Sequence, residues 1–295
     1  MRSRVVRGVV TLAALVAASA AVVVGASGPA SAATPRLQAF GITTGFSPQL
    51  MVAFKTDTPS VSDWVQVVPG LPGGNFLIGI DFRVQDGKLY GVDNAGNIYT
   101  IPASATSAPT TLTKVSQLAV TLSGSSFGVD FNPAADRLRV ISDTGQNLRH
   151  NLNDHTTIMD NNLNQGTVTP ARGVAGAAYT NNDLNAATAT TLFDIDTNND
   201  TVVIQSPPNN GSLVATGSLG FDVGLNAGFD MFSTLYGGKT VSNTAFASLT
   251  MASGGNPYLY MIDPLTANAT IAASDPTRGQ FPLNISDIAI SLTGV

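Results

Sequence analysis

The 295-residue chain contains no Cys and no Glu, so disulfide bonds are excluded and all 19 acidic side chains are Asp. Charged residues make up only 11% of the chain, against about 25% in an average globular domain. The sequence has no run of Lys or Arg that could neutralise phosphates, which argues against a nucleic-acid partner. Long helices are also unexpected, because Glu is a good helix former and Asp competes with the helical backbone.

Turn-forming residues are abundant instead, with 29 Gly and 16 Pro and many Asn. This composition favours many short strands joined by tight turns, so the sequence predicts an all-β fold.

The first 32 residues read as an export signal. Arg2, Arg4 and Arg7 precede an uncharged apolar run that ends in Ala30-Ser31-Ala32, the pattern of a signal peptide with its cleavage site. A transmembrane anchor is the alternative, but Gly25, Gly28 and Pro29 interrupt the run and no basic stop-transfer cluster follows. We therefore expect a bacterial, secreted, extracellular protein of residues 33–295, free of the membrane after cleavage.

A repeat of about 50 residues follows. Gly79-Ile80-Asp81-Phe82 recurs at 128–131 and, more loosely, at 176–179 and 228–231, and each copy precedes further short apolar runs separated by polar turns. Four antiparallel strands per unit are typical of a propeller blade. A β-sandwich is the alternative, although it gives no reason for a strand opening to recur at constant distance.

The two ends of the chain set the blade count. Residues 38–43, 49–55 and 63–68 read as three strands without an innermost one, and the strand 285–292 has no later partner. We predict a five-bladed β-propeller closed by this C-terminal strand, which completes the first blade. The predicted blades span about 37–74 plus 285–293, 76–120, 125–170, 172–222 and 225–283.

The stretches LIGIDFR (77–83), LYGVD (89–93), FGVDFNPAADRLRVISDTGQNLR (127–149) and VVIQSPPNNGSL (202–213) resemble the bacterial secreted family known as domain of unknown function 4394. The resemblance covers about residues 37–293. It implies a propeller-like repeat domain, and no catalytic or binding residues that could be transferred. Asp194 departs from the pattern, because a Gly like Gly91 is expected there.

One loop suggests a calcium site, the only cofactor that the sequence indicates. Asp194, Asp196, Asn198 and Asp200 place side-chain oxygens at alternate positions, the spacing with which a calcium loop surrounds its ion. The Gly and the bidentate Glu of an EF-hand are missing. The alternative is a hairpin turn in which Asp and Asn cap their own backbone.

A second candidate site is catalytic. Asp81, Asp130 and Asp230 share one position in three predicted innermost strands, so the ring could bring their carboxylates together at the central channel. Such a cluster could bind cations or do acid/base chemistry with Arg83, Arg137 or Arg139. The alternative is structural, with each carboxylate accepting backbone N–H groups of its own or a neighbouring blade.

Two further patterns are weak. His150 and His155 lie near Asp154 and Asp160, but this spacing does not specify a metal site. Residues 124–128 match the G-x-S-x-G nucleophile motif, yet that motif requires a helix after its serine, and here a strand follows.

The sequence therefore favours a non-enzymatic, monomeric binding or scaffold module with an unknown extracellular ligand or protein partner. The alternative is an extracellular hydrolase or lyase with a carboxylate site at the mouth of the channel. Fold alone does not decide between them, because propellers host both functions.

Overall fold

The computed structural model describes residues 33–273 and 275–295, so the predicted signal peptide lies outside the described residues. Residues 34–295 form one compact unit. Within the described part, no helix is long and apolar enough to cross a membrane.

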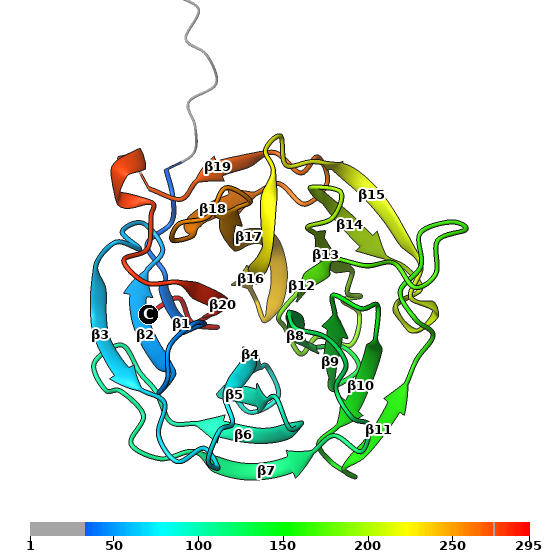
Figure 1. The fold of residues 1–295 in the computed structure, drawn as a ribbon, viewed down its shortest axis with the longest axis horizontal. Helices are drawn as coiled ribbons and strands as arrows, with labels where there is room; N and C mark the ends of the chain where they lie inside the picture. Colours follow the sequence, from blue (N-terminus) through cyan, green and yellow to red (C-terminus); the bar gives the residue numbers. More distant parts are fainter. Residues whose placement is uncertain (1–32, 274) are drawn as a thin grey trace, which may run out of the picture. The chain divides into compact units, whose positions relative to one another are not determined.

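The unit consists of five four-stranded antiparallel sheets arranged as blades around a central axis (Figure 1). From the innermost strand outward, the first blade is β20 (Ile285–Ile290), β1 (Gln38–Thr43), β2 (Leu50–Lys55) and β3 (Ser62–Val67). The second is β4 (Leu77–Arg83), β5 (Lys88–Asp93), β6 (Asn97–Ile101) and β7 (Thr113–Gln117). The third is β8 (Phe127–Asn132), β9 (Arg137–Ser142), β10 (Asn147–Asn151) and β11 (Thr156–Met159).

The fourth blade is β12 (Val174–Tyr179), β13 (Leu192–Asp196), β14 (Thr201–Gln205) and β15 (Leu213–Ser218). The fifth is β16 (Val223–Tyr236), β17 (Lys239–Met251), β18 (Tyr258–Ile262) and β19 (Ala269–Ile271). The described helices are two short 3₁₀ turns, η1 (Pro208–Asn210) and η2 (Pro276–Arg278). The predicted all-β class and the five-bladed propeller are confirmed.

The predicted closure is also confirmed, because β20 pairs antiparallel with β1 in the first blade. Ile285, Ile288 and Ile290 are buried in an apolar cluster that also contains Phe54 and Phe246, so the last strand joins the first and fifth blades. This arrangement leaves the first blade with four strands like the others.

Apolar side chains fill the space between neighbouring blades. For example, Ile78 and Val92 of the second blade pack with Val129 and Phe131 of the third. The repeated Gly lets the innermost strands approach closely, since a Cβ at Gly79 would lie 2.3 Å from the Val129 side chain. The motif that revealed the repeat is therefore a packing requirement at the axis.

The fifth blade differs from its predicted form. Its first two strands are 14 and 13 residues long and continue as one hairpin that turns at Gly237 and Gly238, both with positive φ. The hairpin carries the exposed side chains of Leu235, Tyr236 and Val241. The sequence predicts only the parts of these strands that lie far from the turn, because the residues next to the turn lack an apolar run.

Candidate functional site

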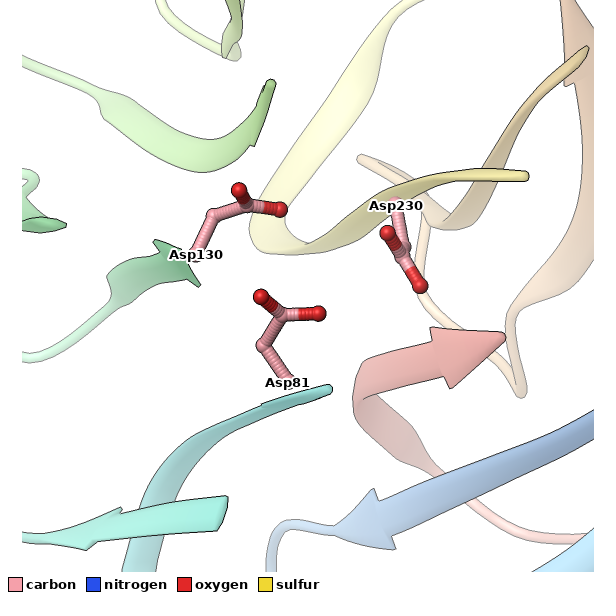
Figure 2. A group of neighbouring side chains, drawn as sticks. All are labelled: Asp81, Asp130 and Asp230. Carbon is pink, nitrogen blue, oxygen red and sulfur yellow. The ribbon is translucent and has the colours of Figure 1, made fainter. Parts of the chain in front are cut away.

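Three carboxylates meet at the axis of the propeller. Asp81 of β4, Asp130 of β8 and Asp230 of β16 point into a common space (Figure 2). All three are at most 6% exposed, and one oxygen of each lies within 4.8 Å of the others. The structure thus brings together the three residues that the sequence places at one position of the repeat.

The hydrogen bonds of these carboxylates run around the ring. Asp81 accepts the Phe131 N–H of the next innermost strand at 2.7 Å, and Asp130 accepts the Tyr179 N–H at 3.2 Å. Asp230 accepts the Ile290 N–H of the first blade. Each carboxylate therefore links its own blade to the following one.

Asp287 is a fourth buried carboxylate near the axis, which the sequence analysis missed. It accepts the Ile80 N–H at 2.8 Å and lies close to Gly228. It was overlooked because it aligns with the Gly of the repeat, whereas Ala289 of the same strand aligns with the Asp position. Ala178 takes the Asp position in the fourth blade.

Burial dominates the electrostatics of the cluster. It raises the pKa of Asp230 to about 7. It also raises the pKa values of Asp81 and Asp130 well above the ordinary range, and the neighbouring carboxylates raise them further. The cluster therefore favours bound protons, or a cation in their place.

The spacing of the three carboxylates is compatible with a cation. Oxygens up to 4.8 Å apart fit opposite ligands of an ion with bonds of about 2.3–2.6 Å, as in calcium sites. Asp81, Asp130 and Asp230 supply three side chains for an ion that takes about six to eight oxygens. Those residues could hold such an ion.

A cavity lies elsewhere in the described structure, at the end of the ring where β4 and β8 begin. Its volume is about 640 Å³, and it opens between the loop 43–49, the loop 68–76 and residues 125–127. Exposed Phe46 and Phe76 belong to its apolar lining, which also contains Val, Leu, Ile and Pro residues, and nine Ser, Thr, Asn and Gln residues form its polar lining. No Asp, Lys, Arg, His or Tyr lines this cavity.

Polar contacts fix the cavity walls. Gln49 links the first and second blades, because its amide donates to the Thr43 and Leu77 carbonyls and accepts the Leu77 N–H. Behind the wall, Asp93 accepts from Asn75 and Asp143 accepts from the Ser125 hydroxyl. These carboxylates hold the lining in place and are not themselves part of it.

The three carboxylates of the predicted calcium loop have different hydrogen-bond environments. Asp194 of β13 is fully buried with both oxygens unpartnered, whereas Asp196 accepts the N–H groups of Asn198 and Asn199. Asp200 accepts the Val223 N–H. These contacts are those of the alternative, a capped hairpin turn, and calcium binding at the loop stays a prediction.

Asp194 occupies the position at which the repeat pattern predicts a Gly like Gly91. It pairs with Ala177 as Gly91 pairs with Ile80. Burial raises the pKa of its carboxyl well above the usual range, although nearby Arg139 acts in the opposite direction.

Buried His150 and exposed His155 form a hydrogen-bonded chain with Ser116. The Thr157 hydroxyl accepts the Ala119 N–H and can then donate to Nδ1 of His150 at 2.9 Å. Ser116 Oγ lies 2.8 Å from His150 Nε2 and 2.9 Å from His155 Nδ1. Ser116 and the two histidines do not line the cavity described above, so a ligand bound there would not contact this hydrogen-bonded chain.

The G-x-S-x-G match lacks a base. The Ser126 hydroxyl donates to the carbonyl oxygen of Leu225. The basic residues considered as partners of the axial carboxylates lie elsewhere, since Arg83 pairs with Asp86 and Asp136. Arg137 and Arg139 line a smaller cavity between the third and fourth blades.

The chain matches the profile of the family described as Domain of unknown function (DUF4394) over residues 50–289, so the resemblance seen in the sequence is confirmed. A comparison with curated proteins finds no match.

Several solved structures are similar to this chain. A protein of unknown function from Bacteroides thetaiotaomicron VPI-5482 is 16% identical with a TM-score of 0.50, over 88% of this chain and 68% of that one. A protein of unknown function from Bacteroides caccae is 12% identical with a TM-score of 0.45, over 86% and 99%. The glutaminyl cyclase of Myxococcus xanthus is 11% identical with a TM-score of 0.45, over 74% and 87%. The likeness to the first of these proteins, at 16% identity, concerns the fold alone.

Proposed function

We propose that this chain, which belongs to the family of the domain of unknown function DUF4394, is an exported binding protein for a small uncharged molecule. The cavity at the start of β4 and β8 is the binding site. Its ligand carries hydroxyl or amide groups and an apolar face.

One observation carries this proposal: the cavity of about 640 Å³ has no ionisable side chain in its lining. Its volume lies in the range of about 300–1,000 Å³ that small-molecule sites occupy. A charged ligand would lose its hydration there without gaining an ion pair. Hydroxyl and amide groups can instead pair with the Ser, Thr, Asn and Gln side chains of the wall.

The two exposed phenylalanines support the same assignment. Phe46 and Phe76 are 45% and 48% exposed, and both face the cavity as part of its lining. Aromatic rings at a concave site gain contact area when a ligand covers them. They therefore provide an apolar surface beside the hydrogen-bonding groups.

The same lining argues against the alternative of a hydrolase or lyase. General acid/base catalysis requires a titratable group within hydrogen-bond reach of the substrate. The axial carboxylates Asp81, Asp130 and Asp230 are buried and do not line the cavity. A ligand in the cavity would therefore contact no such group.

Calorimetric titration with neutral mono- and disaccharides and with uncharged blocked dipeptides tests the proposal. We expect one of these classes to bind with an affinity that changes little with salt, since no charge pair forms. Phe76→Ala should weaken binding, whereas Tyr236→Ala should not, because Tyr236 is 82% exposed on the distant hairpin. Turnover of the bound compound, or equal effects of both substitutions, would contradict the proposal.

A further inference from the structure

A second cavity, of about 180 Å³, lies between the third and fourth blades and concentrates positive charge. Arg137 and Arg139 of β9 and Arg149 of β10 all line it. The chain has 14 Lys and Arg residues in total, so three guanidinium groups in one small cavity are a marked concentration. Arg139 and Arg149 are direct cross-strand partners, an arrangement that like charges disfavour.

A single carboxylate offsets this charge through ion pairs. Asp160 accepts from Arg139 at 2.8 Å and from Arg149 at 2.9 Å. Arg137 forms no ion pair with the described residues, and its guanidinium donates only to the carbonyls of Ala135 and Asp136. The nearby Asp136 carboxylate is itself held by Arg83. Three cations with one paired anion leave a surplus of positive charge in the cavity.

The remaining polar groups of the lining are available as donors. The side-chain oxygen of Asn209 already accepts from Arg139, and that of Asn132 accepts the Ala135 N–H. Their amide NH₂ groups are therefore left to donate. Arg139 is fixed in place, with its side chain 4% exposed and further bonds to Asn147 and Tyr179.

We propose that this cavity binds a small tetrahedral dianion, a phosphate or sulfate group that is free or part of a small ester. Guanidinium groups match such oxyanions through paired N–H donors. The volume is too small for a large ligand and suits one anionic group. This site is independent of the proposed function at the other cavity, since the two share no lining residue.

Thermal melting with inorganic phosphate as the probe tests the site. A ligand of the native state raises the melting temperature in a saturable way. We expect phosphate and sulfate to do so at concentrations where sodium chloride of equal ionic strength has little effect. Succinate, a dianion of different shape, should stabilise the protein less. Equal effects of phosphate and chloride, or of phosphate and succinate, would overturn the assignment.

Arg137→Gln is the decisive variant, because it removes a charge from the cavity without breaking an ion pair. We expect the apparent affinity for phosphate to fall by about tenfold or more, the size of a lost charged hydrogen bond. Arg137→Lys keeps the charge without the planar fork and should give an intermediate loss. Arg172→Gln, at an exposed arginine outside the lining, is the matched control.

The melting temperature in chloride alone reports whether each variant folds. If Arg137→Gln does not fold, the graded loss in Arg137→Lys still measures the contribution of the fork. A full phosphate response in both Arg137 variants would overturn the assignment, because Arg137 would then contribute nothing to phosphate binding.

Discussion

Replacing Asp230 by Asn should change how the stability of the protein depends on pH. Burial raises the pKa of the Asp230 carboxyl to about 7, against about 4 in an unfolded chain. The folded protein therefore keeps a proton that the unfolded chain releases. Because the folded state binds more protons, this group makes stability fall as pH rises from about 4 to about 7.

The size of the effect follows from that shift. Between about pH 5 and pH 8, Asp230 alone costs roughly 2–3 kcal/mol of unfolding free energy. The Asp230 charge also raises the pKa of Asp81, so its removal acts in the same direction at a second group. In a domain of this size, that cost corresponds to a melting-temperature change on the order of 5–10 °C.

Asp230→Asn is expected to be less stable than the wild type at about pH 5. Asp230 accepts the N–H groups of both Met231 and Ile290, and an amide brings its NH₂ group toward one of them. The difference in unfolding free energy between the wild type and the variant should then shrink by roughly 2–3 kcal/mol between about pH 5 and pH 8, because the variant has no carboxylate to ionise at position 230. The measurement is thermal and urea unfolding of both proteins at fixed ionic strength.

His150 titrates in the same range with the opposite sign. Burial lowers its pKa to about 4, so stability falls as pH drops below about 6.5. Because both proteins contain His150, its effect cancels when the two pH profiles are subtracted. Asp222→Asn, at an exposed carboxylate, is the control and should give a flat difference. A flat or growing deficit in Asp230→Asn would refute the reasoning.

Three further predictions concern closure, an unpaired carboxylate and calcium. Deleting residues 285–295 removes three buried Ile side chains at about 1.5–3 kcal/mol each and leaves β1 without a partner on the edge that faces away from β2. The protein should therefore aggregate in light scattering; a monomer with unchanged melting temperature would contradict the closure argument. Asp194→Val, which inserts the residue that the third blade has as Val140, should raise stability by about 1–3 kcal/mol at pH 8 and by less at pH 5, because the unpartnered carboxyl has a raised pKa; a lower melting temperature at pH 8 would count against it. Calcium binding at residues 194–200 predicts a higher melting temperature in millimolar calcium than in chelator and loss of that difference in Asp196→Asn, whereas an unchanged melting temperature would leave only the hydrogen-bonded turn.

Much of the fold was predictable because the repeat marks its own packing. Gly79 and Gly128 recur where innermost strands touch, so their spacing located four of the five innermost strands and left the C-terminal strand as the fifth. The long hairpin β16–β17 was not predictable to its full length, since its outer half is exposed and carries no apolar period.

The sites were harder to predict because they depend on pairings between distant segments. The shared register of Asp81 and Asp130 follows from the sequence, but strand alternation does not say which side faces the axis. The mutual approach of Arg139 and Arg149 requires the β9–β10 register. The uncharged cavity is formed by loops of separate blades, and no motif marks such a surface.

The position of the alanines explains why the axis holds three carboxylates in this register and not five. In each of the five innermost strands, one backbone N–H group follows the repeated Asp position. Asp130 accepts only one of these five groups, the Tyr179 N–H. Ala289 of β20 offers no carboxylate to the next strand around the ring, β4. The Phe82 N–H of β4 is therefore accepted by Asp81 of the same strand, which also accepts the Phe131 N–H. Ala178 of β12 likewise offers none to β16, so Asp230 of β16 accepts its own Met231 N–H as well as the Ile290 N–H.

Three carboxylates thus satisfy all five backbone donors of this layer. A fourth carboxylate at Ala178 or Ala289 would find no N–H group left to accept and would add repulsion at a site where burial and neighbouring carboxylates already raise the pKa values. The cluster is therefore explained by the closure of the ring, and the two proposed ligand sites are the cavities that lie outside it.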